Sequence, residues 1–246
     1  WTGVFKASET NILDKEELIS AQEMMSEDLY DQEFECSFQA AITGSYYGAL
    51  IEDLQNNNRI TSVPYDENLE VETWWDLGLK DSTAIWFVQK YRDEFRIIDY
   101  EENSGEGLDF YADLLDSKPY KYDRHIAPHD IKVRELGAFG KSRLESALEL
   151  GISFDIAPKL SIEDGIEAVR KTLPKCYFDK EKTYQGVEAL KAYQKKWDDK
   201  NQCFKNRPIH NFASHPADAF RYGCTFIGGK MTDWKKEVYV NTNYIV

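Results

Sequence analysis

The stretch TWWDLGLKDST at residues 73–83 decides the predicted fold, because it places an acidic residue inside what otherwise reads as a buried β-strand. Aspartate is depleted in strands, so Asp76 needs a reason to be there. Side chains alternate along a strand, which puts Asp76 on the face opposite to Trp75 and Leu77. Gly78 leaves room for another group to approach. A carboxylate on a rigid strand beside a gap suits a metal site or a phosphate-handling site.

The pattern around this stretch predicts an α/β domain. Strands expected at 71–78, 82–91 and 94–102 are joined by short polar connections, which is typical of an antiparallel meander. Helices and strands then alternate, and this order predicts a mixed sheet with helices packed on it. The later elements are expected at 107–117 (helix), 123–128 (strand), 141–150 (helix), 152–156 (strand), and 161–173, 182–198 and 216–227 (helices).

The segment before the meander differs in composition. Residues 1–72 carry 16 acidic and 3 basic residues, whereas the remainder of the chain is close to neutral. A helix is expected at about 45–55, and the polar, proline-containing stretch that follows it places a boundary near residue 70. We therefore expect a linker at 1–70, a main domain at 71–230 and a tail at 231–246, in a piece cut from a longer protein.

Composition excludes some classes of protein. No run approaches the roughly 18 consecutive apolar residues of a membrane span. The four cysteines lack the spacing of a zinc site, which fits a reducing cytosol. The net charge of −14 argues against a nucleic-acid partner, but residues 132–143 contain four basic residues and one acidic residue. Basic surface is therefore available locally.

Two further aspartates are placed where side chains are presented to solvent. Asp130 follows the strand expected at 123–128, and Asp218 lies in the first turn of the helix expected at 216–227. With Asp76 they form three carboxylates on three elements, a set that suits a pair of Mg²⁺ or Mn²⁺ ions. Asp130 also fits a turn or cap residue, and Asp218 a helix N-terminus stabilised by the macrodipole.

At this point the sequence resembles a known family. The strings WWDLGLKDST (74–83), IAPHDIKVRELG (126–137) and PIHNFASHPADAFRYG (208–223) together resemble the C-terminal nuclease domain of large terminase subunits from tailed double-stranded DNA bacteriophages. The resemblance covers residues 71–228, and the preceding stretch DLYDQEFECSFQAAITGSYYGAL (28–50) resembles the end of that family's ATPase domain and its linker. It implies an RNase H-like fold and a metal-dependent endonuclease that cuts concatemeric viral DNA during genome packaging.

The resemblance also implies roles for individual residues. Asp76 would bridge two Mg²⁺ or Mn²⁺ ions, and Asp130 and Asp218 would each complete one coordination shell. Asp81 matches an auxiliary acidic position, although a solvated turn residue fits it equally well. Asn211 stands where many relatives have a more acidic residue.

The resemblance implies double-stranded DNA, the ATPase domain of the same subunit, the portal protein and the small terminase subunit as partners. It places the protein in the host cytoplasm, with no membrane contact. The sequence contains no GxxxxGK[ST] loop for nucleotide.

His129 and His215 flank two of the aspartates and are expected to support them. Basic residues near Asp130 are expected to grip DNA phosphates, namely Lys132, Arg134, Lys141 and Arg143.

Two other interpretations stay open. The string DLGLKDST (76–83) also resembles the first phosphate loop of actin-like and sugar-kinase ATPases, which share an RNase H-like core. Those enzymes need a second Asp-x-Gly loop, and 76–78 is the one occurrence in the sequence. The other interpretation is a non-catalytic domain that docks on DNA or on a portal.

Overall fold

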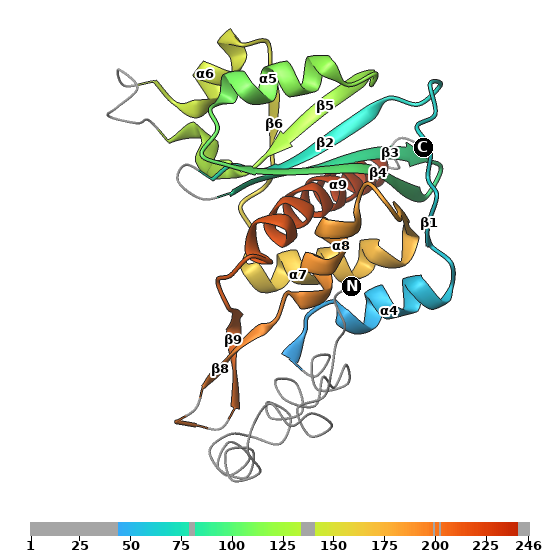
Figure 1. The fold of residues 1–246 in the computed structure, drawn as a ribbon, viewed down its shortest axis with the longest axis vertical. Helices are drawn as coiled ribbons and strands as arrows, with labels where there is room; N and C mark the ends of the chain where they lie inside the picture. Colours follow the sequence, from blue (N-terminus) through green and yellow to red (C-terminus); the bar gives the residue numbers. More distant parts are fainter. Residues whose placement is uncertain (1–43, 79–81, 134–140, 199, 202, 241–246) are drawn as a thin grey trace, which may run out of the picture.

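A mixed sheet lies at the centre of the protein, between two layers of helices (Figure 1). The structure is a computed structural model that describes residues 44–78, 82–133, 141–198, 200, 201 and 203–240. Within these residues the sheet has seven strands in the order β1-β7-β4-β3-β2-β5-β6. The predicted α/β architecture is confirmed.

The predicted meander forms the middle of the sheet. Strands β2 (Val71–Asp76), β3 (Ser82–Tyr91) and β4 (Glu94–Ser104) pair antiparallel. On its other side β2 pairs parallel with β5 (Tyr122–Ala127), which pairs parallel with β6 (Phe154–Ile156). The carboxyl ends of β2 and β5 therefore meet at one edge of the sheet.

The opposite side of the sheet contains two strands that the sequence analysis did not predict. β7 (Cys176–Asp179) pairs parallel with β4 and with β1 (Ile60–Thr61). The Asp179 carboxylate accepts a hydrogen bond from the backbone of Val63 at 2.9 Å. The expected boundary near residue 70 thus falls between two strands of one sheet.

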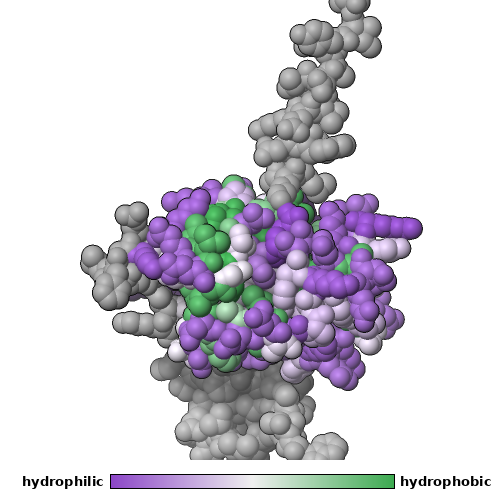
Figure 2. Space-filling view, turned by 90° about the horizontal axis from the view of Figure 1, so that it is seen from above, coloured by the Kyte–Doolittle hydropathy of each residue, from purple (hydrophilic) through white to green (hydrophobic). Residues whose placement is uncertain are grey.

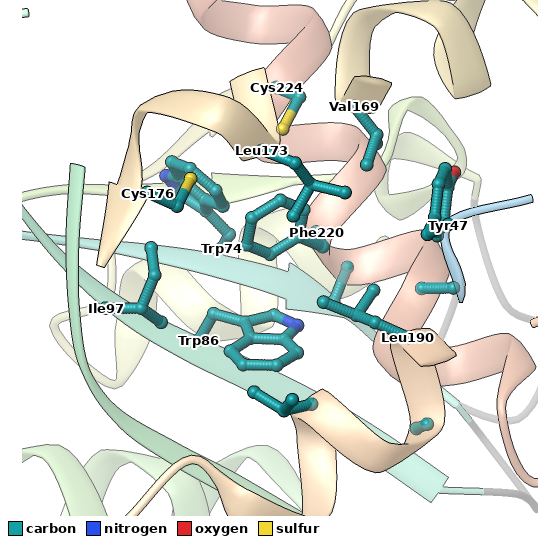
Figure 3. Close-up of a cluster of buried hydrophobic side chains, with 14 of the residues drawn as sticks. Tyr47, Trp74, Trp86, Ile97, Val169, Leu173, Cys176, Leu190, Phe220 and Cys224 are labelled. Atoms are coloured by element: carbon teal, nitrogen blue, oxygen red, sulfur yellow. The ribbon is translucent and has the colours of Figure 1, made fainter. Parts of the chain in front are cut away.

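Four helices cover the lower face of the sheet (Figure 1). They are α4 (Gly48–Asn56), α7 (Ile162–Thr172), α8 (Tyr184–Ala192) and α9 (Ser214–Val240), with a short 3-10 helix, η4 (Leu173–Lys175), after α7. Trp74 and Trp86 project from the sheet into this core and meet Phe220 of α9 at centroid distances of 5.1 and 5.3 Å (Figure 3). Aromatic burial on this scale is a large source of stability.

The upper face is covered by α5 (Leu108–Ser117) and α6 (Arg143–Glu149). Trp75 points into this second core, so Trp74 and Trp75 lie on opposite faces, as the strand alternation predicts. The layer is incomplete at α6, where Leu148 is 64% exposed. Figure 2 shows apolar side chains at the surface on this side of the molecule.

The helix predicted at 182–198 is wrong in its second half. Helix α8 ends at Ala192, where Tyr193 turns to an extended backbone. The Tyr193 carbonyl instead accepts a hydrogen bond from the backbone of Tyr46 at 2.9 Å. The chain continues as β8 (Lys195–Asp198), which pairs antiparallel with β9 (Cys203–Pro208) in a hairpin that extends away from the sheet (Figure 1).

Helix α9 begins at Ser214, two residues before the predicted start, and reaches Val240, well into the stretch expected as a tail. The backbone carbonyl of Asn211 accepts a hydrogen bond from the backbone of Ser214, and its side chain accepts one from the backbone of Ala213, both at 3.0 Å. These contacts form the turn that starts the helix. No helix in the described segments combines the length and apolar content needed to cross a membrane.

Helix α9 lies very close to β2. A Cβ atom on Gly223 would stand 1.9 Å from Cδ2 of Trp74, far inside van der Waals contact. The missing side chain therefore allows the helix to rest directly on the indole ring.

We expect Gly223→Ala to destabilise the protein by about 1–3 kcal/mol, because an added methyl forces the helix or the indole to move in a packed core. Chemical unfolding would measure this. Gly228→Ala is the matched control, since a Cβ there meets nothing within 4 Å. Equal stability of both variants would contradict the packing argument.

A half-buried imidazole joins β2 to β5. His125 Nδ1 lies 2.6 Å from the Thr73 hydroxyl, which also accepts a hydrogen bond from the Trp75 indole at 2.6 Å. Burial lowers the pKa of His125 to about 4. The folded protein therefore holds this histidine neutral at pH values where the unfolded chain protonates it.

The stability of the protein should fall as the pH drops from about 6.5 towards 4. The unfolded chain binds a proton at His125 in this window and the folded protein does not, which lowers the free energy of unfolding by about 3 kcal/mol. Urea unfolding at a series of pH values would measure it. His125→Asn, which does not titrate, should show a shallower decline, and an unchanged decline would contradict the assignment.

Candidate active site

Asp76 is the last residue of β2, and its side chain faces α9. The carboxylate lies 2.8 Å from Nδ1 of His215, and both side chains are 16% exposed. Burial is the main cause that raises the pKa of Asp76, and the negative charges of Asp218 and Asp130 raise it further, while His215 opposes the shift. The three aspartates therefore share one electrostatic environment.

Asp218 lies on α9, the helix that packs across β2, β3 and β5. Because α9 begins at Ser214, Asp218 lies beyond its first turn, so stabilisation by the macrodipole does not explain it. Arg221 donates two hydrogen bonds to Asp218, from Nη2 at 2.9 Å and from Nε at 3.2 Å. Arg221 was not predicted from the sequence, although its i+3 position relative to Asp218 indicates contact on a helix.

Asp130 lies in η2 (His129–Lys132), a 3-10 helix that begins two residues after β5. Its side chain is exposed. Because β2 and β5 are parallel, Asp130 follows the same edge of the sheet at which Asp76 lies. The backbone carbonyl of Asp130 accepts a hydrogen bond from Val133 at 2.9 Å, which closes a short turn and leaves the carboxylate out of that bond.

The side chains around the aspartates are held by the start of α9. His215 is the second residue of the helix, and its ring meets that of His210 edge-on at 5.7 Å. Asn211, which stands where a more acidic residue was expected, makes the turn that begins α9. His215 therefore contacts Asp76 directly, and Asn211 acts on the same region through the backbone.

The predicted phosphate contacts differ in their environment. Lys132 is exposed. Lys141 pairs with Glu149 at 2.6 Å, and Arg143 donates to the carbonyl of Leu77 at 2.7 Å, next to Asp76. Arg143 therefore braces the end of β2. Arg134 and Asp81 lie outside the described residues.

A groove of about 450 Å³ opens beside the end of β2. Leu77 and Gly78 form one wall, which agrees with the predicted room next to Gly78. Glu106, Asp109 and Arg143 also line the groove, whereas Asp76, Asp130 and Asp218 are not among its lining residues.

The donor set fits a hard divalent cation in its chemistry. Carboxylate oxygens are the ligands that Mg²⁺ and Mn²⁺ favour. The charges of both other aspartates raise the pKa of Asp76. No three His, Cys, Asp or Glu side chains in the described segments are close enough to form a complete metal cluster. Asp76, Asp130 and Asp218 are thus in one neighbourhood without forming a closed site.

Comparisons with known proteins agree with this fold. Neither a protein-family model nor a curated protein matches the sequence. The large terminase of a thermophilic bacteriophage is similar in structure, with a TM-score of 0.54 at 17% identity over 89% of this chain. The same terminase in complex with ATP-γ-S gives a TM-score of 0.55 at 18% identity over 91% of this chain.

The chain spans 54% of the length of that thermophilic phage terminase in the first comparison and 55% in the second. The nuclease domain of the P22 large terminase gives a TM-score of 0.53 at 19% identity, covering 70% of this chain and 89% of that domain. The chain therefore has the RNase H-like fold of large terminase nuclease domains.

Proposed function

We propose that the protein is a metal-dependent endonuclease that cuts concatemeric double-stranded viral DNA during genome packaging. The observation that carries the proposal is the environment of Asp76, which faces α9 and is within electrostatic reach of Asp130 and Asp218. Aspartate is depleted in strands, and Asp76 is the last residue of a mostly buried one. The terminase-like fold adds support.

In this proposal Asp76, Asp130 and Asp218 hold two Mg²⁺ or Mn²⁺ ions, and Asp81 is an auxiliary ligand. When bound, the ions supply an activated water and stabilisation of the leaving oxygen in an in-line phosphoryl displacement. The carboxylates need such ions, because they would otherwise repel the DNA phosphates.

Neighbouring residues of the chain prepare the carboxylates. His215 holds one oxygen of Asp76 at 2.8 Å and so limits the rotation of that side chain. Arg143 holds the carbonyl of Leu77 at 2.7 Å and fixes the end of β2. Lys132, at the exposed end of η2, contacts a backbone phosphate and orients the duplex.

The partners in this proposal are double-stranded DNA, an ATPase domain of the same subunit, the portal protein and the small terminase subunit, in the host cytoplasm. The division into a linker at 1–70, a nuclease domain at 71–230 and a tail at 231–246 belongs to the same proposal. The match to the P22 nuclease domain, which covers 70% of this chain, is compatible with this division.

Asp76→Asn should reduce Mn²⁺-dependent cleavage of plasmid DNA by more than about 100-fold, since loss of a residue that merely supports a ligand costs about 10–100-fold. The folded protein disfavours the charge of Asp76, because its pKa is raised, so the neutral variant should be at least as stable. Cleavage assays and thermal unfolding test both points. Cleavage at the wild-type rate would refute the proposal, and ATP binding measured by calorimetry would favour the kinase-like alternative.

Lys132→Ala should weaken DNA binding and reduce the slope of log affinity against log salt by about one, because one phosphate contact is lost. Fluorescence anisotropy over a salt series would measure both. Lys175→Ala is the matched control, since exposed Lys175 precedes β7 at the end of the sheet far from Asp76. Equal slopes for the two variants would remove Lys132 from the DNA contact.

A further inference from the structure

We infer that Arg221 is a positioning residue that orients the carboxylate of Asp218 for metal binding. The inference rests on the proposed function, because it gives Asp218 the role of a metal ligand. Arg221 itself need not contact the metal or the DNA. It acts through one oxygen of one side chain.

The geometry of the pair supports this role. Nη2 and Nε of Arg221 both donate to Oδ1 of Asp218, at 2.9 and 3.2 Å. Oδ2 of Asp218 receives no hydrogen bond from the residues that the structure describes. Arg221 is 10% exposed in its side chain and Asp218 is 30% exposed, so the arginine is buried while the carboxylate reaches the surface. The second oxygen is therefore left for a cation.

The path of Arg221 through the core is specific. A Cβ atom on Gly165 of α7 would stand 2.6 Å from Cδ of Arg221, so the arginine runs against the bare backbone of that helix. The guanidinium lies 4.7 Å from the ring centre of Tyr222. Tyr47 and Tyr193 stack on each other at 5.6 Å and lie within electrostatic reach of the same pair. These rings exclude water and strengthen the pair.

A second pair in the chain shows the difference between a positioned arginine and a surface arginine. Arg170 and Glu167 of α7 are also three residues apart and lie 2.6 Å apart, with side chains 38% and 54% exposed. Exposed pairs of this kind contribute little to stability. Asp218 differs because its partner cannot leave the core.

Two substitutions disturb the pair in different ways. Arg221→Lys keeps the positive charge but removes the fork of donors that fixes Oδ1. Gly165→Ala leaves both charges in place and displaces Arg221 by the contact at 2.6 Å. A loss of metal affinity shared by both variants would therefore report orientation rather than charge.

The test is a titration of the full chain with Mn²⁺ by calorimetry in the absence of DNA, together with thermal unfolding of each variant. We expect Arg221→Lys and Gly165→Ala to weaken Mn²⁺ affinity by about 10-fold or more, within the range for residues that support a ligand. Gly228→Ala is the matched control and should bind as the wild type does. If Arg221→Lys does not fold, the folded Gly165→Ala variant decides the result.

Asp218→Asn distinguishes failure of the role of Arg221 from failure of the proposed function. Loss of Mn²⁺ binding in Asp218→Asn, with wild-type affinity in folded Arg221→Lys and Gly165→Ala, would overturn the role of Arg221 and leave the proposed function standing. Wild-type affinity in Asp218→Asn would overturn the proposed function and the inference with it. Weakened affinity in all three variants, with unchanged affinity in Gly228→Ala, supports both the role of Arg221 and the proposed function.

Discussion

Helix α9 rests directly on the indole of Trp74 because Gly223 has no side chain, and this contact brings the two layers of the site together. Trp74 lies two residues before Asp76 on the same face of β2, and Gly223 lies five residues after Asp218 on the same helix. The distance between the two carboxylates therefore depends on a packing contact. Dense packing of the core therefore also fixes the geometry of the site, because a rigid core transmits small displacements to its surroundings.

The charged side chains near this contact, Asp76 and the Arg221–Asp218 pair, are not arranged to give the folded protein the greatest stability. Burial and two neighbouring carboxylates raise the pKa of Asp76, so its ionised form is disfavoured relative to an exposed aspartate. Burial lowers the pKa of Arg221, but the charge and hydrogen bonds of Asp218, together with the neighbouring Tyr222 and Tyr193, outweigh it and raise the pKa above the ordinary value. One carboxylate of the site thus has a buried counter-ion and another has a histidine. Such an arrangement is typical of a site selected for function, because apolar residues would stabilise the core more.

Local pattern predicted the parts of the structure that local interactions determine. Strand alternation placed Trp74 and Trp75 in separate cores, and both lie where it predicted. The end of α8 was missed because Tyr193 leaves the helix to bond with Tyr46, a contact between residues distant in sequence. The four-residue strand β7 was missed because its pairing with β1 and β4 has no signal in its own short sequence. The sequence pattern singled out the three aspartates as candidates. The contact of Asp76 with His215 joins residues far apart in the sequence and could be seen only in the folded structure.

The segment before residue 70 supports the site from a distance. Tyr47, at the start of α4, stacks on Tyr193, and both rings lie within reach of the Arg221–Asp218 pair. The backbone of Tyr46 is held by Tyr193 and by Arg170 of α7. Because Arg221 holds Asp218, Tyr46 and Tyr47 belong to the packed surroundings of that carboxylate, where little room is left for displacement.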